Sequence, residues 1–259
     1  MKRYTIICRD QELSSLVAKN LHPKLQAIGM IHDLEQPELI ITIGGDGTLL
    51  HAVHSFLDHL EDVAFIGLHT GTLGFFTDYT SEEIDEFVND LQNEHRIVST
   101  PLIHIECFNG GLRHDLYAMN EGRIENIIKT QTMDVYIDDE YLEKFRGNGL
   151  CVSAQIGSTA YNRSIDGAII DSQIQALQLT EISGIHHKFF RSLKNPIILH
   201  PQTKISLRAE SFEGAMLVYD HLNIDLHKTT RVDFTLGDKE VRFLRLRPVS
   251  YFSRLRNLF

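Results

Sequence analysis

The stretch Leu39-Ile40-Ile41-Thr42-Ile43-Gly44-Gly45-Asp46-Gly47-Thr48 decides the fold that we expect of this chain. Its first five residues are apolar or β-branched without a regular polar alternation, which is typical of a strand buried on both faces of a parallel sheet. After the glycines, apolar residues recur at helical spacing at Leu49, Leu50, Val53, Phe56, Leu57 and Leu60. The stretch therefore predicts a buried strand, a glycine-rich turn and a helix in succession.

The same alternation of strand and helix extends over the first hundred residues. Short β-branched or apolar runs at residues 4–8 and 63–66 predict two further strands. A helix is predicted before the quoted stretch by the near-helical spacing of Leu13, Leu16, Val17 and Leu21. Strands that alternate with helices in this way indicate a mainly parallel sheet.

The second half of the chain has a different periodicity. Apolar residues alternate there with period two, at Ile103, Ile105 and Cys107, at Met133, Val135 and Ile137, and at Val232, Phe234 and Leu236. That pattern predicts antiparallel strands, and Gly237-Asp238-Lys239 predicts a turn after the last of them. Residues 172–185 interrupt the pattern with a spacing that favours a helix.

The change in periodicity predicts two domains and a tail. We expect an α/β domain with a mainly parallel sheet at residues 1–100, and a mostly antiparallel, β-rich domain at residues 101–250. Residues 251–259 mix arginines with apolar side chains. We expect them to form an amphipathic strap that docks on another domain or subunit.

Composition limits the class of partner. The formal net charge of -10 argues against a nucleic-acid surface, because phosphate backbones are bound by clustered Lys and Arg. No apolar run approaches the roughly 18 residues of a membrane helix, and we expect no signal peptide. The three cysteines are far apart in the sequence, so we expect no disulfide framework or zinc site. We therefore expect a cytoplasmic protein with neither a nucleic-acid nor a membrane partner, while small anionic ligands stay open where they meet local donors.

The glycine-rich turn is placed where an open α/β sheet binds ligands. Glycines at the carboxyl end of a strand let backbone N–H groups approach phosphates beside the positive end of a helix. Asp46 would then lie beside the phosphates, where a carboxylate can take a proton from a hydroxyl or help to hold a metal ion. The alternative is a tight turn in which Asp46 caps the helix. The sequence has no Walker A motif and no Gly-x-Gly-x-x-Gly fingerprint, so this is a different kind of phosphate site.

The loop at residues 44–48 resembles the Gly-Gly-Asp-Gly-Thr loop of the superfamily that joins NAD kinases, diacylglycerol and sphingosine kinases, and phosphofructokinases. Five further segments resemble NAD kinases in particular, and their order and spacing also match. They are residues 66–75, Asn120-Glu121, residues 146–153, residues 157–162 and residues 218–221. The resemblance covers essentially the full length and is closest to the short bacterial NAD kinases.

The resemblance implies an enzyme that phosphorylates the 2′-hydroxyl of the adenosine ribose of NAD to give NADP, with ATP as the phosphoryl donor and Asp46 as the general base. It also implies a divalent metal, Mg²⁺ or Mn²⁺, whose protein ligands stay unidentified, and a homo-oligomer, commonly a tetramer. The phosphate-donor loop would comprise Gly44, Gly45, Gly47 and Thr48. The residues implied to contact NAD are Asp46, Gly47, Phe75, Asn120, Glu121, Arg146, Asn148, Ser158, Thr159, Ala160, Tyr161, Asn162, Ser164, Ser183 and His221.

The sequence departs from the family pattern at three places. Asn148 stands where the family has Asp between two glycines, Ala154-Gln155-Ile156 replaces Thr-Pro-Thr or Thr-Pro-Ser, and Asp166-Gly167 replaces a Gly-Gly pair. Two other functions stay open. A lipid or sugar kinase of the same superfamily would not need the Asn120-Glu121 and Ser158 to Tyr161 elements together. A nucleotide-binding regulator that descends from an NAD kinase and has lost activity would not require Asp46.

Overall fold

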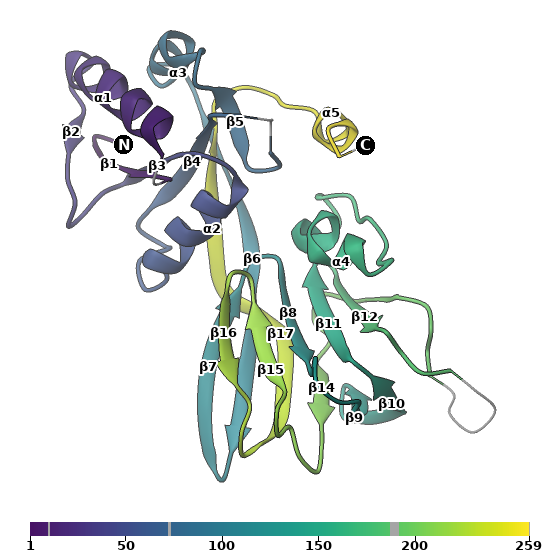
Figure 1. The fold of residues 1–259 in the computed structure, drawn as a ribbon. Coiled ribbons are helices and arrows are strands. Elements are labelled where there is room, and N and C mark those ends of the chain that lie inside the picture. Colours follow the sequence, from purple (N-terminus) through teal and green to yellow (C-terminus); the bar gives the residue numbers. More distant parts are fainter. Residues whose placement is uncertain (10, 72–73, 187–191, 259) are drawn as a thin grey trace. The chain divides into compact units, whose positions relative to one another are not determined.

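The computed structural model describes residues 1–9, 11–71, 74–186 and 192–258 (Figure 1). Contacts divide the chain into two compact units, of which the first comprises Met1–Thr100 with Lys239–Phe259 and the second Pro101–Asp238. Residues 239–250 therefore lie in the first unit, whereas the sequence placed them in the second domain. The reason is that the end of strand β17 (Thr229–Arg245) pairs in parallel with β4 (Ala64–His69) of the first unit.

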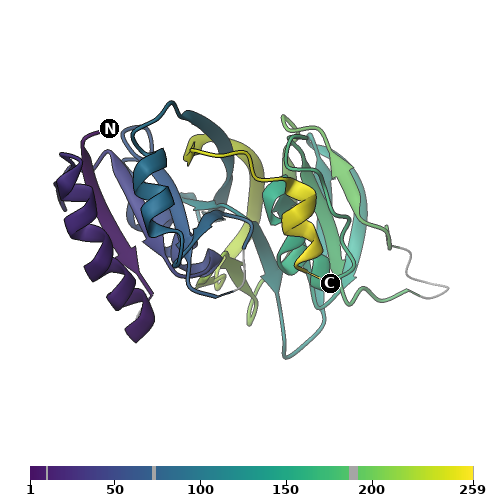
Figure 2. The ribbon, with the colours of Figure 1, turned by 90° about the horizontal axis from the view of Figure 1, so that it is seen from above.

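The first unit has a parallel sheet with helices on both faces. Its strands run in the order β2-β1-β3-β4, and both β5 and the end of β17 pair with β4. The further strands are β1 (Arg3–Cys8), β2 (Ile31–His32), β3 (Leu39–Ile43) and β5 (Thr77–Thr80). The helices are α1 (Glu12–Ala27), α2 (Asp46–Ser55), α3 (Ile84–Asp90) and α5 (Tyr251–Arg256). Figures 1 and 2 show α1 and α3 on one face of the sheet and α2 on the other.

The core of the first unit explains why the chain folds this way around β3. All five residues of β3 are buried, and Ile41 lies in one core cluster with Leu21 of α1 and Phe87 of α3. Burying an apolar side chain of this size contributes about 1.5 to 3 kcal/mol, so a strand that is apolar on both faces is stabilised when helices cover both. Of the four apolar residues predicted to form the buried face of α1, only two are buried. Leu13 and Leu16 are 49% and 63% exposed, whereas Val17, Leu21 and Leu25 are buried.

The second unit has two antiparallel sheets around one core. The first sheet contains β6 (Arg96–Asn109), β7 (Leu112–Ala118), β9 (Gln131–Ile137), β10 (Glu140–Gly147), β14 (Ile205–Arg208) and the start of β17. The second contains β8 (Glu121–Glu125), β11 (Gly149–Ala154), β12 (Leu177–Ile182), β13 (Ile197–Leu199), β15 (Met216–Tyr219) and β16 (Leu222–Asp225). Two short helices, η1 (Gln155–Thr159) and α4 (Tyr161–Ser164), follow β11. The core joins residues of both sheets, such as Ile105 of β6 and Val152 of β11.

Two local predictions are wrong. Residues 172–185 contain strand β12 instead of a helix, because β12 pairs with β11 on one side and with β13 on the other. The predicted turn at residues 237–239 does not form, since β17 continues through them. Gly237 serves a close approach: a Cβ added there would lie 3.0 Å from Cβ of His104 on β6. Among the helices that the structure describes, none has the length and apolar character needed to cross a membrane.

Candidate active site

The glycine-rich turn between β3 and α2 is open on one side. Gly45 is the N-cap of α2, with φ of -101°, and the helix begins at Asp46. A Cβ added at Gly44 would lie 2.3 Å from Oγ1 of Thr48, so packing within the chain requires this glycine. A Cβ added at Gly45 or Gly47 would meet no described atom within 4 Å. These two glycines are not required by the protein's own packing, and they leave space for a ligand to approach the backbone.

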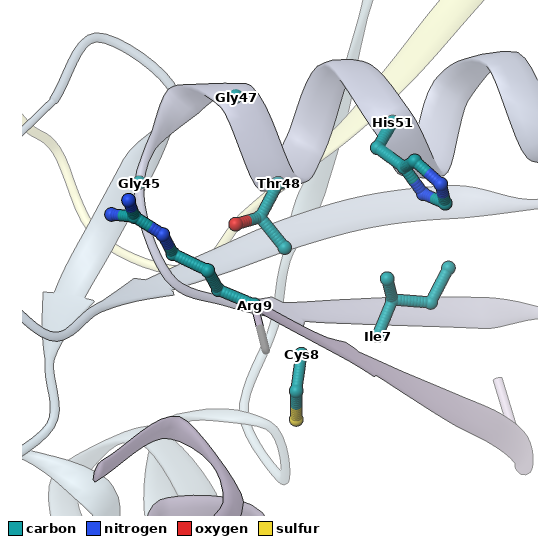
Figure 3. Close-up of a pocket in the computed structure, with 7 residues that line it drawn as sticks. All are labelled: Ile7, Cys8, Arg9, Gly45, Gly47, Thr48 and His51. Carbon is teal, nitrogen blue, oxygen red and sulfur yellow. The ribbon is translucent and has the colours of Figure 1, made fainter. Parts of the chain in front are cut away.

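A cavity of about 560 Å³ lies beside this turn (Figure 3). Its lining residues are Ile7, Cys8, Arg9, Gly45, Gly47, Thr48 and His51. Figure 3 shows Arg9 and the hydroxyl of Thr48 at the end of the cavity where the turn begins, and His51 about one turn further along α2. The cavity therefore combines a guanidinium, a hydroxyl and the N-terminus of a ten-residue helix, which are the donors that bind phosphate groups.

Arg9 is a candidate site residue that the sequence interpretation missed. It directly follows β1, which pairs in parallel with β3, so both strands end at the same edge of the sheet. Its backbone N–H donates to the carbonyl of Ile43 at 3.0 Å, which fixes it beside the glycine-rich turn. The sequence did contain a signal for Arg9, because a cationic residue that directly follows one parallel strand lies near the loop that follows the neighbouring strand.

Asp46 is held by the backbone of residues 74–76. Its Oδ2 accepts from the N–H of Phe75 at 2.9 Å, and its Oδ1 accepts from the N–H of Phe76 at 3.1 Å. A Cβ added at Gly74 would lie 2.2 Å from Oδ1, so glycine is needed where the carboxylate packs. The alternative in which Asp46 is the N-cap is wrong, since Gly45 occupies that position. Two N–H donors instead fix the orientation of the Asp46 carboxylate.

The segment that holds Asp46 is in turn held from the C-terminal tail. Arg254 of α5 is buried, and its guanidinium donates to the carbonyl of Phe75 and to Oδ1 of Asp78. Asp78 also accepts from Nη1 of Arg245 at 2.7 and 2.9 Å. Burial lowers the pKa of the Arg254 guanidinium, and the charge of Asp78 opposes that shift. The predicted strap thus docks within the first unit, through a buried arginine, while Phe252 is 66% exposed.

In the second unit, Asn120 and Glu121 form a buried pair at the start of β8. Asp220 accepts from the N–H of Met119 at 2.7 Å and from the N–H of Asn120 at 2.8 Å, which fixes the backbone there. Oδ1 of Asn120 and Oε2 of Glu121 are buried without a hydrogen-bond partner among the described residues. Leaving a buried acceptor unsatisfied costs about 1 to 3 kcal/mol. Such atoms are therefore candidates for contacts to a polar ligand.

The pKa of the Glu121 carboxyl group lies well above its ordinary value. Burial raises its pKa to about 8 and the nearby Asp220 adds to the shift, whereas Arg123 and the backbone N–H of Tyr161 oppose it. Arg123 lies two residues along the same face of β8, with Nη1 4.0 Å from Oε1 of Glu121. The guanidinium carbon of Arg123 lies 3.8 Å from the centroid of the Tyr161 ring. Arg123, which the sequence interpretation did not select, thus covers one face of Tyr161.

The segment of residues 157–164 divides into buried and accessible positions. Ser158 donates to the carbonyl of Gln155 at 2.6 Å, and Oδ1 of Asn162 accepts from Thr180 at 2.8 Å, so both side chains are engaged within the protein. Thr159, Ala160 and Tyr161 are half-buried, and Ser164 is exposed. Ser158 and Asn162 therefore shape the segment, while the others have accessible surface.

Arg146, Asn148 and Ser183 come together through their backbones. The N–H of Asn148 donates to Ile182 at 3.0 Å, and the carbonyl of Arg146 accepts from Ile185 at 2.8 Å. A Cβ added at Gly147 would lie 2.7 Å from the carbonyl oxygen of Ser183. His221 is placed elsewhere in the second unit, in the turn between β15 and β16, next to Asp220.

The fold and these sites define a nucleotide-binding protein with a phosphate-type turn in an α/β unit and buried acceptors in a β-rich unit. Residues 11–97 match the sequence model of the ATP-NAD kinase N-terminal domain, and residues 117–246 match that of the ATP-NAD kinase C-terminal domain. A relative from Geobacillus stearothermophilus, named NAD kinase, is 35% identical over 260 residues, which is 99% of this chain and 96% of the relative. The chain belongs to the NAD kinase family, and it is therefore a kinase.

Two solved structures share the fold. A yeast NADH kinase complexed with NADH has a TM-score of 0.81 and 18% identity, and the match covers 100% of this chain and 86% of that chain. An NAD kinase from Archaeoglobus fulgidus in complex with ATP has a TM-score of 0.81 and 19% identity, over 98% of this chain and 99% of that chain. The fold class and the family resemblance predicted from the sequence are confirmed.

Proposed function

We propose that this protein transfers the terminal phosphoryl group of ATP to the 2′-hydroxyl of the adenosine ribose of NAD and so forms NADP. The observation that carries the proposal is the cavity beside Gly45 and Gly47, where space, backbone N–H groups and Arg9 meet. The family supports the two substrates, because the Geobacillus stearothermophilus relative is named NAD kinase and the structure from Archaeoglobus fulgidus holds ATP.

On the donor side, residues 44–48 and Arg9 bind the triphosphate. The first N–H groups of α2 have no partner within the helix, and the helix dipole favours negative charge at that end. Arg9 adds a charge-assisted contact, which is roughly twice as strong as a neutral hydrogen bond. Oγ1 of Thr48 faces the same turn and offers a hydroxyl. ATP binding therefore does not need a P-loop lysine.

On the acceptor side, Asn120 and Glu121 hold the adenosine of NAD. Their unpartnered oxygens, Oδ1 of Asn120 and Oε2 of Glu121, accept from the base or from ribose hydroxyls, which satisfies two buried groups at once. Thr159, Ala160, Tyr161, Ser164 and His221 complete this half of the NAD contact set. Ser158 and Asn162 belong to it through the backbone shape that they maintain. Arg146, Asn148 and Ser183 contact the nicotinamide half.

Asp46 is the general base, and Phe75 positions it. A carboxylate has about four lone-pair sites, so Asp46 keeps acceptor capacity after accepting from Phe75 and Phe76. It takes the proton of the 2′-hydroxyl as the ribose oxygen attacks the terminal phosphorus in line and the bond to the leaving diphosphate oxygen breaks. No covalent phosphoenzyme is formed.

A divalent cation, Mg²⁺ or Mn²⁺, fits the residues present if phosphate oxygens and water supply most of its ligands. Among the described residues, His, Cys, Asp and Glu form no cluster of three that could hold a metal. Mg²⁺ commonly keeps several waters and binds substrate phosphates, so it fits this turn without a protein cage, and its protein ligands stay unassigned. When bound, the cation offsets negative charge on the transferring phosphoryl group.

We also propose that the protein forms a homo-oligomer, a tetramer by resemblance to the family. Measuring the mass of the protein in solution tests this proposal.

The proposed reaction is tested with the purified protein, ATP, Mg²⁺ and NAD, by following NADP with a dehydrogenase specific for that product. Reactions without ATP and without NAD are the controls. We expect NADP that accumulates in proportion to enzyme. Binding of NAD and ATP without any NADP would instead support a nucleotide-binding regulator. Phosphorylation of a lipid or sugar in place of NAD would support the other kinases of the superfamily.

A further inference from the structure

We propose that Arg254, in the C-terminal helix α5, is a positioning residue for the catalytic carboxylate of Asp46. It acts through residues 74–78, the segment whose N–H groups hold that carboxylate. The inference rests on the proposed function, because it concerns how Asp46 is oriented for proton transfer. Arg254 itself is not proposed to contact substrate.

The contacts form a continuous chain from the tail to the carboxylate. The guanidinium of Arg254 donates to the carbonyl oxygen of Phe75. The N–H of the same residue, Phe75, donates to Oδ2 of Asp46 at 2.9 Å. The next N–H, that of Phe76, donates to Oδ1 of Asp46 at 3.1 Å. Fixing the backbone at Phe75 thus fixes both donors that orient Asp46.

The guanidinium holds this segment at two points. One amino group of Arg254 donates to Phe75 and the other to Oδ1 of Asp78, three residues further on. Asp78 is 1% exposed and is also paired with Arg245, so its carboxylate is a firm anchor. A planar guanidinium has donors in a fixed fork, whereas the ammonium of lysine is a compact point charge on a flexible stem. The bridge between residues 75 and 78 is therefore specific for arginine.

The environment of Arg254 favours this role over a surface ion pair. Its side chain is 6% exposed, and the negative charge of Asp46 is among the charges that raise the pKa of the guanidinium against the effect of burial. The ring of Tyr251, at the start of α5, lies 6.1 Å from the ring of Phe75 and packs the helix on the same segment. A displacement of about 1 Å at a reacting group can lower a rate by about 10²-fold. Without the two hydrogen bonds of the Arg254 guanidinium, residues 75–78 would be free to move, and the Asp46 carboxylate would be displaced with them.

The test compares Arg254→Ala and Arg254→Lys with Arg256→Ala, which removes an exposed arginine from the same helix. We expect both Arg254 variants to lower kcat for NADP formation by about 10- to 100-fold with KM for ATP and NAD changed by less than about threefold. Arg256→Ala should keep the parent kcat. Arg254→Lys retains the buried charge, so it provides the measurement if Arg254→Ala does not fold.

A double-mutant cycle decides whether Arg254 acts through Asp46. In an Asp46→Asn background the base is already lost, so Arg254→Ala should change kcat by less than about threefold. If the two losses multiply instead, Arg254 does not act through Asp46 and the inference is overturned. A parent that forms no NADP, or an Asp46→Asn variant with parent turnover, would contradict the proposed function itself. These outcomes are therefore distinguishable.

Hydrogen exchange gives a second reading that does not depend on turnover. The amides of Phe75 and Phe76 are protected by their bonds to Asp46. In Arg254→Ala they should exchange faster, while the amides of β3 keep the parent rate. Uniformly faster exchange across the first unit would show a structural role only. Unchanged exchange at Phe75 and Phe76 would also overturn the inference.

Discussion

Asp46 is best understood from what its carboxylate contacts. As the first residue of α2 it gains from the helix dipole, but its oxygens accept from the N–H groups of Phe75 and Phe76 and do not cap the helix. A carboxylate that served only to cap a helix would be worth about 0.5 to 2 kcal/mol of stability and nothing in turnover. Stability and turnover therefore separate the two roles.

We predict that Asp46→Asn lowers turnover by about two to four orders of magnitude, the range for loss of a positioned base. Affinity for NAD should stay near that of the parent, because asparagine keeps the size of the side chain. Steady-state kinetics and calorimetric NAD binding measure the two effects. A variant that binds NAD normally and turns over within a few-fold of the parent would show that Asp46 is not the base.

Asn148 offers a second prediction at this scale. Its Nδ2 donates to the carbonyl of Asn126 at 3.4 Å, which is a weak bond. Asn148→Asp loses this donor and gains a negative charge, which favours the cationic oxidised nicotinamide. We expect KM for NAD⁺ to fall by up to about tenfold relative to KM for NADH, since a bond to a charged group is worth about 1 kcal/mol more than a neutral one. ATP parameters should not change.

The second variant for this prediction is Asp166→Gly, which removes a negative charge that lies 18 residues further along the sequence. Asp166 has φ of 63°, a left-handed conformation that glycine adopts freely and aspartate tolerates. Glycine there should therefore fold at least as well as the parent. Equal changes in KM for NAD⁺ and NADH in Asn148→Asp would mean that position 148 does not sense the nicotinamide charge.

At the scale of the element, a substitution in the first turn of α2 is expected to change the stability of the protein and its affinity for ATP in opposite directions. A Cβ added at Gly47 meets no described atom within 4 Å, and alanine is favoured over glycine within a helix by roughly 0.5 to 1 kcal/mol. We predict that Gly47→Ala raises the melting temperature while raising KM for ATP, because the new methyl group lies where phosphate approaches. Thermal melting and ATP kinetics of one preparation test both. A higher melting temperature with unchanged KM would place the triphosphate elsewhere.

Elements whose sequence pattern matches their environment were predictable, and β12 shows why others were not. Strand β3 is apolar except for Thr42 and is buried on both faces, so its pattern and its environment agree. In β12 the polar residues Gln178 and Thr180 are also buried, because Gln178 bonds to Ala168 and Thr180 to Asn162. Their polarity therefore did not mark an exposed face. Pairing with β11 and β13, which single-sequence patterns do not record, determined the structure.

The residues of the candidate site likewise divide into those that the sequence predicted and those that it did not. Residues 44–48 were predicted from a local signal, because glycines between a buried strand and a helix mark a tight turn, whereas the pair Asn120-Glu121 was predicted from the resemblance to NAD kinases. Arg9, Arg123 and Arg254 were not selected. Arg9 depends on which strands are neighbours, and Arg254 contacts Phe75, 179 residues earlier in the sequence. Contacts of that separation arise from tertiary folding and leave no periodic trace.

At the scale of the whole molecule, Glu121 predicts how stability depends on pH. Its folded-state pKa is about 8, above the ordinary value of 4.5, so the folded protein holds a proton that the unfolded chain releases between these values. The contribution of protonated Glu121 to stability is therefore fully present below about pH 4.5 and is lost as pH rises to 8, with a slope of up to about 1.4 kcal/mol per pH unit. Denaturant unfolding of the ligand-free protein from pH 5.5 to 8 measures this slope.

Glu121→Gln should flatten that slope, because glutamine stays neutral and nearly keeps the shape of the protonated acid. Glu125→Gln is the matched control, since Glu125 lies on the same face of β8 but is only half-buried. We expect the control to keep the parent slope. The window avoids Glu83, whose pKa Arg247 lowers to about 2 and whose contribution is lost only in stronger acid. Identical slopes in parent and Glu121→Gln would contradict the assignment.

Strand β17 has a consequence for the order in which the chain is made and folded. Residues 1–100 leave the ribosome first, yet their unit takes a strand pairing and helix α5 from residues 239–259. The second unit, residues 101–238, is continuous and is fully synthesised before that segment. The unit that is made first is therefore completed last. A nascent chain already carries Asp46 and its glycines while it still lacks Arg254, so the first unit can be completed only after the second unit has been synthesised.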